Sequence, residues 1–307
     1  MKKTVSRRQK QLLAVAGITA GALIAVLAVA LVLLLRPAAG PGGDPVQRPG
    51  MGLGEVLGTK LGGDPAQALN GWASVTDFGA VPDDGGDDTA AFEAAAKSGY
   101  SVFIPAGEYH LERPIALNGQ GLRGCGTRIT RVISRCTDPA QPIFRVGGTA
   151  TVRDLSMGYD PALITGSEGE GERIALQMGA KIPAVAGSRV ANLGFTHVGT
   201  AVRIGGDGPS CDNTAFEELR IEAFSFRGVE IIGENSGNVF RGVWLENSGA
   251  DADCAVWVDG EDSAVVLDRV IAVGCTLKNG ISASAESGAF IRGTLFENGS
   301  IAGGGKS

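Results

Sequence analysis

The chain has 307 residues, of which 20% are charged, and its formal net charge is −6. Because it is mildly acidic and carries no basic stripe beyond Arg36, nucleic acid is not expected as a partner. With 48 glycines and only 6% aromatic residues, the composition favours short strands and tight turns over a helical bundle.

Residues 12–35 form an apolar run without a charged side chain. As a helix its 24 residues would rise roughly 36 Å, enough to cross the hydrocarbon core of a bilayer. Lysines and arginines precede the run, whereas Arg36 alone follows it directly. The positive-inside bias therefore predicts a cytoplasmic tail at 1–11, a transmembrane signal anchor at 12–35 and a periplasmic or extracellular domain. A cleaved signal peptide is the alternative, although its apolar core would normally be shorter.

Residues 36–72 are rich in proline, glycine and aspartate and show no periodicity. They are expected to form a flexible tether between the membrane and the folded domain. Beyond it, Val75–Phe78 is predicted as a short strand. Asp87 or Asp88 is suited to N-cap a helix at about Thr89–Lys97. Apolar strands are expected to follow at 102–104 and 109–111.

Three motifs occur in order in this stretch: Asp-Phe-Gly-Ala at 77–80, Asp-Asp-Thr-Ala-Ala-Phe at 87–92 and Ile-Pro-Ala-Gly-Glu-Tyr at 104–109. Together they resemble the N-terminal part of the pectate-lyase-like superfamily, in the branch shared with polygalacturonases and phage tailspike proteins. The resemblance implies an all-β, right-handed parallel β-helix whose short helix closes the N-terminal end. It also implies that the acidic loop belongs to the cap, and it makes polysaccharide, or a cell-envelope glycan, the expected partner.

Internal repeats predict the same solenoid independently of the resemblance. Five segments with starts 24 to 27 residues apart share one apolar pattern: 190–195, 216–221, 240–245, 267–272 and 291–296. A second apolar strand lies between them, at 201–204, 228–231, 255–258 and 280–283. Stacked coils would bury both strands, and an in-phase repeat favours this over an antiparallel sandwich. The domain is therefore placed at 73–307, with its cap at 73–111 and coils from about 112 to 302; residues 159–187 fit poorly and suggest a loop insertion.

Aligning the repeats places one outward-facing position of each coil in a single column: Thr196, Glu222, Glu246, Val273 and Glu297. Glu222 and Glu246 would lie on adjacent coils, about 5 Å apart at the backbone, which suits the carboxylate pair of a retaining glycosidase. They are the candidate catalytic residues. Trp244 and Trp257 are the candidate sugar-binding residues, because an aromatic ring stacks on a sugar ring. The alternative is an ordinary solvated face.

The polygalacturonases of the superfamily carry Gly-His-Gly and Arg-Ile-Lys motifs that are absent from this sequence. Two functions therefore remain open: a protein that binds or processes polysaccharide by glycosidic cleavage, or a non-catalytic structural or adhesion module. No cofactor is required by any motif. Calcium, which binds oxygen ligands, is the alternative for four acidic residues that also suit turns between coils: Asp251, Asp253, Glu261 and Asp262.

Five cysteines include one pair close in sequence, Cys125 and Cys136, which is a disulfide candidate in an oxidising compartment. Burial of both as small apolar residues is an equal alternative. The two histidines, His110 and His197, lie far apart and do not suggest a metal site. The chain continues only briefly after the last repeat, so trimerisation, a partner, or the tail itself is expected to cover the open end of the solenoid.

Overall fold

The computed structural model describes residues 71–179, 185–206, 210–246, 252–259, 264–273, 279–283, 288–296 and 301–303. The expected cytoplasmic tail, the apolar run at 12–35 and the tether up to residue 70 lie outside these ranges. Within them, no helix has both the length and the apolar character needed to span a membrane.

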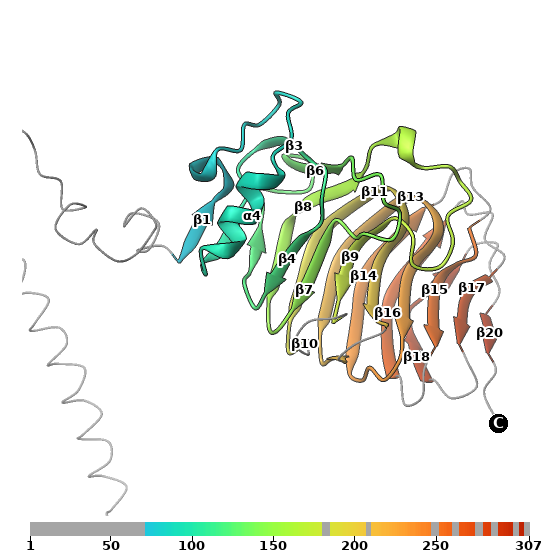
Figure 1. Ribbon diagram of the computed structural model, residues 1–307. Coiled ribbons are helices and arrows are strands. Elements are labelled where there is room, and N and C mark those ends of the chain that lie inside the picture. The colour runs from blue at the N-terminus through green and yellow to red at the C-terminus, as the bar shows by residue number, and fades with distance from the viewer. Residues whose placement is uncertain are drawn as a thin grey trace, which may run out of the picture. The chain divides into compact units, whose positions relative to one another are not determined.

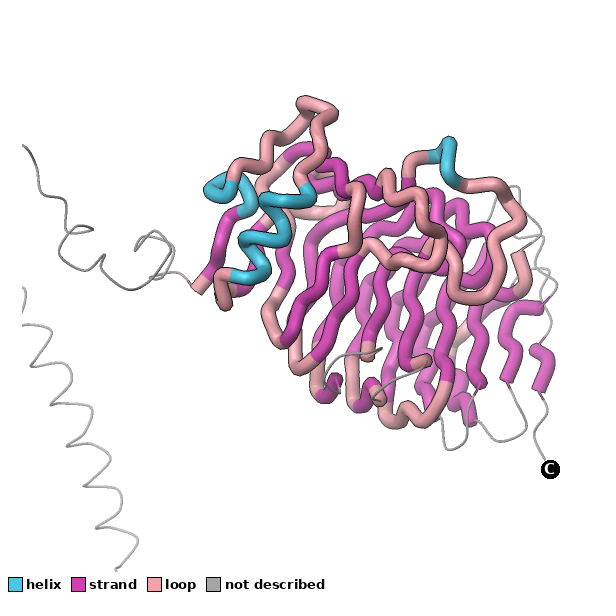
Figure 2. The backbone as a smooth tube through the Cα atoms, in the orientation of Figure 1, coloured by secondary structure: helices cyan, strands magenta, loops and turns pink. Residues whose placement is uncertain are grey.

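The described strands pair in parallel from coil to coil and build a right-handed β-helix with three faces (Figures 1 and 2). Face 1 contains β1 (Trp72–Ser74), β2 (Ser101–Phe103), β5 (Leu122–Arg123), β18 (Gly288–Arg292) and the first parts of β8 (Thr151–Tyr159), β11 (Arg189–Gly205), β13 (Ala215–Ile232), β14 (Asn238–Glu246) and β16 (Ala264–Val273).

Face 2 contains β3 (Gly107–Leu111), β6 (Thr130–Ser134), β19 (Leu295–Phe296) and the next parts of the long strands β8, β11, β13, β14 and β16. Face 3 contains β4 (Ile115–Asn118), β7 (Phe144–Gly147), β9 (Ile174–Met178), the last parts of β11 and β13, β15 (Cys254–Asp259), β17 (Asn279–Ala283) and β20 (Ile301–Gly303). The chain passes from face 3 back to face 1 through β10 (Val185–Ala186) and β12 (Cys211–Asp212), which pair with each other.

The long strands turn from face 1 to face 2 at a residue with positive φ. The φ of this residue lies between 52° and 66° in all six coils. In chain order the residues are Asp154, Asn192, Glu218, Gly242, Arg269 and Gly293. The left-handed conformation interrupts the alternation of the strand. Val190 and Leu193, which lie on opposite sides of Asn192 and three residues apart, therefore both point inward. The predicted apolar segments such as 190–195 are therefore bent strands that serve two faces, whereas segment 291–296 is divided between β18 and β19.

The predicted in-phase repeat is confirmed by the strand register. Val190, Phe216, Phe240 and Leu267 pair in turn as neighbours on successive coils. All four are buried, and the rings of Phe216 and Phe240 stack with centroids 4.4 Å apart and 6° between their planes. Like residues on like residues thus build a continuous core along the solenoid.

At the N-terminal end, the expected strand at Val75–Phe78 is instead a 3₁₀ helix, η1, and the strand is β1 (Trp72–Ser74). The reason is local: the backbone N–H groups of Gly79 and Ala80 donate to the carbonyls of Thr76 and Val75, so this segment closes a turn on itself and pairing with β2 stops at Ser74. Helix α4 (Thr89–Lys97) then packs beside β2 and β4. Its Phe92 ring meets Tyr109 edge-on at 5.7 Å.

Asp87 and Asp88, which precede α4, accept hydrogen bonds from different backbone groups. Asp88 is the N-cap residue, but its carboxylate accepts hydrogen bonds from the backbone of Val81 and His110. Asp87 accepts from the Thr89 backbone N–H at 2.9 Å. Burial alone would raise the pKa of Asp87, but the hydrogen bonds from Thr89 and from the Glu112 backbone outweigh it and lower the pKa.

The expected insertion is a loop at 160–173 between β8 and β9, named the strap below; it includes the short helix η2 (Pro161–Leu163). Residues 174–178, which the sequence assigned to the insertion, form the regular strand β9. The strap folds around Glu168, which accepts hydrogen bonds from the backbone N–H of Thr165 and Gly166 and from the hydroxyl of Ser225 on β13. It therefore crosses two coils of the solenoid.

The candidate disulfide is not formed in the structure, where Cys125 and Cys136 are both free thiols. The exposed Cys125 points its sulfur toward the carbonyl of Ile104 on the preceding coil, at 3.9 Å. The buried Cys136 points toward the carbonyl of Asp138, at 3.8 Å. The two side chains thus have different backbone partners.

Candidate functional site

The strand register of face 2 places Thr196, Glu222, Glu246 and Val273 side by side on consecutive coils. The aligned column expected from the repeats is present, apart from Glu297, which lies outside the described residues. The side chain of Glu222 is 37% exposed, in agreement with an outward position. The catalytic roles of Glu222 and Glu246 stay predictions.

Both glutamates interact with their own strand neighbours. The Glu222 carboxylate forms an ion pair with Arg220, two residues earlier on β13. The Glu246 carboxylate accepts a hydrogen bond from the indole Nε1–H of Trp244 at 3.3 Å, two residues earlier on β14. In each strand the two outward positions of face 2 are therefore coupled.

A hollow of about 380 Å³ opens on face 2 beside Glu222. This volume is at the small end of the range for ligand sites. Its floor is built from small residues: a Cβ on Gly194 would lie only 3.1 Å from the Cβ of Ser156. The lining consists of Thr127, Arg128, Arg131, Ser156, Gly194, Phe195, Thr196, Arg220 and Glu222.

Positive charge exceeds negative charge in the hollow. Arg131 is paired with Glu108 at 2.8 Å, and Arg220 is paired with Glu222. Arg128 is exposed and has no ion pair among the described residues. One guanidinium is thus left to attract an anion, and guanidinium groups bind carboxylate, sulfate and phosphate through paired hydrogen bonds.

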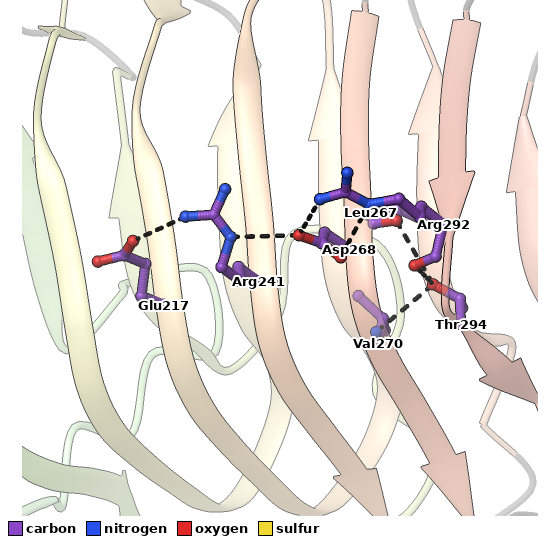
Figure 3. A network of polar contacts seen from close by, with 7 residues as sticks. All are labelled: Glu217, Arg241, Leu267, Asp268, Val270, Arg292 and Thr294. Carbon is purple, nitrogen blue, oxygen red and sulfur yellow. Dashed lines mark hydrogen bonds and ion pairs between the residues drawn. The ribbon is translucent and has the colours of Figure 1, made fainter.

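Face 1 offers a contrasting arrangement of charges. Glu217, Arg241, Asp268 and Arg292 alternate in sign on consecutive coils (Figure 3). Arg241 contacts Glu217 at 3.4 Å and Asp268 at 3.2 Å, and Arg292 contacts Asp268 at 2.6 Å. The hydrogen bond from Arg292 lowers the pKa of Asp268. Because each charge in this ladder meets its opposite, we interpret the ladder as structural.

Trp244 lies on face 2 one coil beyond Arg220, with which it pairs in register. The guanidinium carbon of Arg220 lies 5.9 Å from the centre of the Trp244 ring. Arg220 also lines the hollow, so this one side chain borders both the hollow and the Trp244 ring. The same outward column continues through Ile271 to Leu295, which is 56% exposed.

Trp257, the second candidate sugar-binding residue, lies on β15 of face 3, away from this surface. One side of its ring is occupied by the guanidinium of Arg227, at 4.1 Å, and the same guanidinium lies 4.4 Å from Phe226. The structure thus does not bring Trp257 together with Trp244, Glu222 and Glu246.

Next to Trp257, on the preceding coil, is a buried charge cluster that was not predicted from the sequence. Glu230 is fully buried and lies between Arg203, at 3.2 Å, and Arg227. Burial raises the pKa of Glu230, against the opposing pull of the two arginines. The signal was present in the sequence: Arg203, Glu230 and Trp257 occupy the same place in three consecutive second-strand repeats.

The calcium hypothesis has little support from the described residues. Asp253 forms an ion pair with Arg227 at 2.9 Å. Asp251, Glu261 and Asp262 lie outside the described ranges. Within those ranges, no group of three or more histidine, cysteine or acidic side chains is arranged to hold a metal ion.

Comparison with known proteins gives a family match at the N-terminal end of the domain. Residues 72–131 match the family model described as rhamnogalacturonase A/epimerase, pectate lyase-like. The curated proteins include no sequence that matches the chain.

Three solved structures have similar folds. They are the pre-mature gene product 12 of bacteriophage phi29 (18% identity, 75% of this chain and 33% of that one, TM-score 0.58), the A-module of the Azotobacter vinelandii mannuronan C-5 epimerase AlgE6 (17%, 74% and 68%, 0.55) and the catalytic unit of the GH87 α-1,3-glucanase from Streptomyces thermodiastaticus strain HF3-3 (22%, 80% and 43%, 0.56).

The chain covers about a third of the phi29 protein and less than half of the glucanase, so the likeness concerns the solenoid and not the whole proteins. At these identities the likeness shows the fold. Together with the family match over 72–131, it confirms the resemblance of the chain to the pectate-lyase-like superfamily of right-handed β-helix proteins.

Proposed function

We propose that face 2 binds polysaccharide, with Trp244 and the adjacent arginine-lined hollow as the contact surface. The observation that carries the proposal is the joining of a partly exposed tryptophan to a hollow through one shared residue, Arg220. Aromatic rings with a few convergent polar groups are typical of ligand sites. The names of two structural neighbours, an epimerase of mannuronan and an α-1,3-glucanase, are consistent with a glycan as the ligand.

The charge of the hollow favours an acidic polysaccharide over a neutral one. Arg128 carries a positive charge that no described carboxylate balances, and Arg131 and Arg220 are both more than half exposed. An anionic group on the sugar would complete the balance that face 1 achieves with its own side chains. Salt should weaken such binding, because exposed charges are screened.

The test is native affinity electrophoresis of the full chain in mild detergent, through gels containing alginate, polygalacturonate or neutral dextran. We expect retardation in the acidic gels and its loss in the Arg128→Ala/Arg220→Ala double variant. Arg153→Ala/Arg189→Ala, which removes two exposed arginines from face 1, is the matched control. Equal retardation of the double variant and the wild type would contradict the proposal.

Glycosidic cleavage on the same face is a second candidate, because Glu222 and Glu246 are in-register neighbours on adjacent coils. Product release from the same polysaccharides would be measured for the wild type, Glu222→Gln and Glu246→Gln. Cleavage that is lost in both variants while binding is retained would establish catalysis. Binding without cleavage by the wild type would leave a binding module, and neither activity would favour a structural or adhesion module.

We also propose that residues 12–35 anchor the protein in a membrane and that α4 closes the N-terminal end of the β-helix. The uncharged run with its basic flank supports the first, and the packing of α4 beside β2 and β4 supports the second. Retention in the membrane pellet after alkaline carbonate extraction tests the anchor. Release of the full-length chain into the supernatant would contradict it.

A further inference from the structure

Trp244 is the residue of face 2 whose ring is held from two directions. Its Nε1–H donates to Glu246 on the same strand, at 3.3 Å. The guanidinium of Arg220 approaches the ring from the preceding coil, at 5.9 Å from its centre. The residue as a whole is partly exposed.

Of the two partners, Arg220 has a further side-chain contact of its own. Arg220 is an ion-pair partner of Glu222 and pairs with Trp244 in the strand register. Glu246 occupies the position next to Glu222 on the following coil. The four side chains form a chain of contacts that runs from Glu222 through Arg220 and Trp244 to Glu246. Exposed pairs of this kind contribute little to stability, so their effect on orientation is the more informative property.

We propose that Glu246 is a positioning residue, which together with Arg220 holds the Trp244 ring as a fixed platform for a sugar. The inference rests on the proposed function of face 2, and it gives Glu246 a role other than proton transfer. A ring that is already ordered loses less rotamer entropy when the ligand binds. We expect this preorganisation to strengthen binding about three- to tenfold.

The test compares Glu246→Gln with Glu246→Leu in the full chain. Glutamine retains an oxygen that accepts from the indole N–H but is a poor acid or base, whereas leucine removes the acceptor at similar size. Glu234→Leu, an exposed glutamate after β13, is the control. Ring mobility is measured by time-resolved fluorescence anisotropy with Trp72 and Trp257 replaced by phenylalanine, and affinity by retardation in the polyuronate gel.

The expected result is a more mobile ring and three- to tenfold weaker binding in Glu246→Leu, with both properties restored in Glu246→Gln. Unchanged ring mobility in Glu246→Leu would overturn the inference. So would cleavage by the wild type that Glu246→Gln abolishes while its ring stays ordered, since that result assigns proton transfer to Glu246. Absence of glycan binding in the wild type, with the mobility contrast intact, would instead overturn the proposed function.

Discussion

Faces 2 and 3 each contain an arginine, a tryptophan and a glutamate in contact, but the arginine and the glutamate differ in their exposure to solvent. On each, an arginine lies over a tryptophan of the next coil and pairs with a glutamate: Arg220, Trp244 and Glu222 on face 2, and Arg227, Trp257 and Glu230 on face 3. The side chains of Arg220 and Glu222 are 56% and 37% exposed, whereas those of Arg227 and Glu230 are 8% and 0% exposed.

The difference has a visible cause. The strap reaches face 3, where Glu170 contacts Arg203 at 3.6 Å beside Glu230. The residues that line the hollow of face 2 come from the solenoid and from the turn at 127–128, and none of them belongs to the strap. The same set of side chains thus stabilises the fold where it is covered and remains available to a ligand where it is open.

The largest expected effect concerns the buried member of this comparison. Glu230→Ala should lower the free energy of unfolding by about 3–5 kcal/mol, because it removes the buried carboxylate between Arg203 and Arg227 and leaves these arginines only their more exposed partners, Glu170 and Asp253. Glu222→Ala should cost less than about 1 kcal/mol, because its pair with Arg220 is exposed. Urea denaturation of both variants measures this, and similar losses in the two would show that burial does not separate the faces.

Filling the hollow should weaken binding, and it should also cost some stability, because a Cβ on Gly194 would lie only 3.1 Å from the Cβ of Ser156. In Gly194→Val the new side chain would occupy the space above Ser156 and Thr127. We expect about tenfold weaker binding to polyuronate, equivalent to about 1.4 kcal/mol. Ala191→Val, on the same strand but on face 1, is the control. Full affinity of Gly194→Val would place the ligand elsewhere.

The strap should give a pH dependence that the open face lacks. Burial alone would raise the pKa of Glu168, but hydrogen bonds from Ser225 and Thr165 outweigh it and hold the pKa below its usual 4.5. A carboxylate with a lowered pKa stabilises the fold above its unfolded-state pKa, and this contribution is lost as the pH falls through the folded-state pKa. Between pH 6 and pH 2.5 the free energy of unfolding should therefore fall more steeply with decreasing pH for the wild type than for Glu168→Gln. Parallel curves would contradict this account of the strap.

The smallest effect is expected at the bend between faces 1 and 2. Glu218 adopts φ 53° in a column where asparagine and glycine occupy the equivalent place in neighbouring coils. Because asparagine tolerates this conformation better, Glu218→Asn should stabilise the protein by about 0.5–1 kcal/mol. Thermal unfolding measures the change, with Glu217→Asn as the neighbour that should gain nothing. A lower melting temperature for Glu218→Asn would indicate that the contact of Glu218 over Gly242 matters more than the strain.

The repeating part of this architecture was predictable from the sequence because each coil must bury the same positions. That requirement fixed the register of Val190, Phe216 and Phe240, and with it the column of Glu222 and Glu246. The bend was missed because Glu218 and Arg269 are not residues that normally signal a left-handed conformation. The apolar spacing of three around them was the usable clue, since a straight strand alternates with period two.

The hollow could not be predicted because its wall includes Thr127 and Arg128, which belong to a turn outside the repeat. The buried cluster depends on Arg227, whose position has no counterpart of like charge in the repeats. In both cases the group is completed by a residue that does not recur at the equivalent position of the other coils. Periodicity therefore predicts the scaffold of the solenoid better than its sites.

The central claim is that the arginines of face 2 contact an acidic glycan while those of face 1 serve the fold. The most direct measurement is chemical modification of the full chain by an arginine-selective dicarbonyl, mapped by mass spectrometry with and without polyuronate. The account predicts that polyuronate protects Arg128 and Arg220 and leaves Arg189 on face 1 equally reactive. Protection of Arg189 without protection of Arg128 and Arg220 would contradict it.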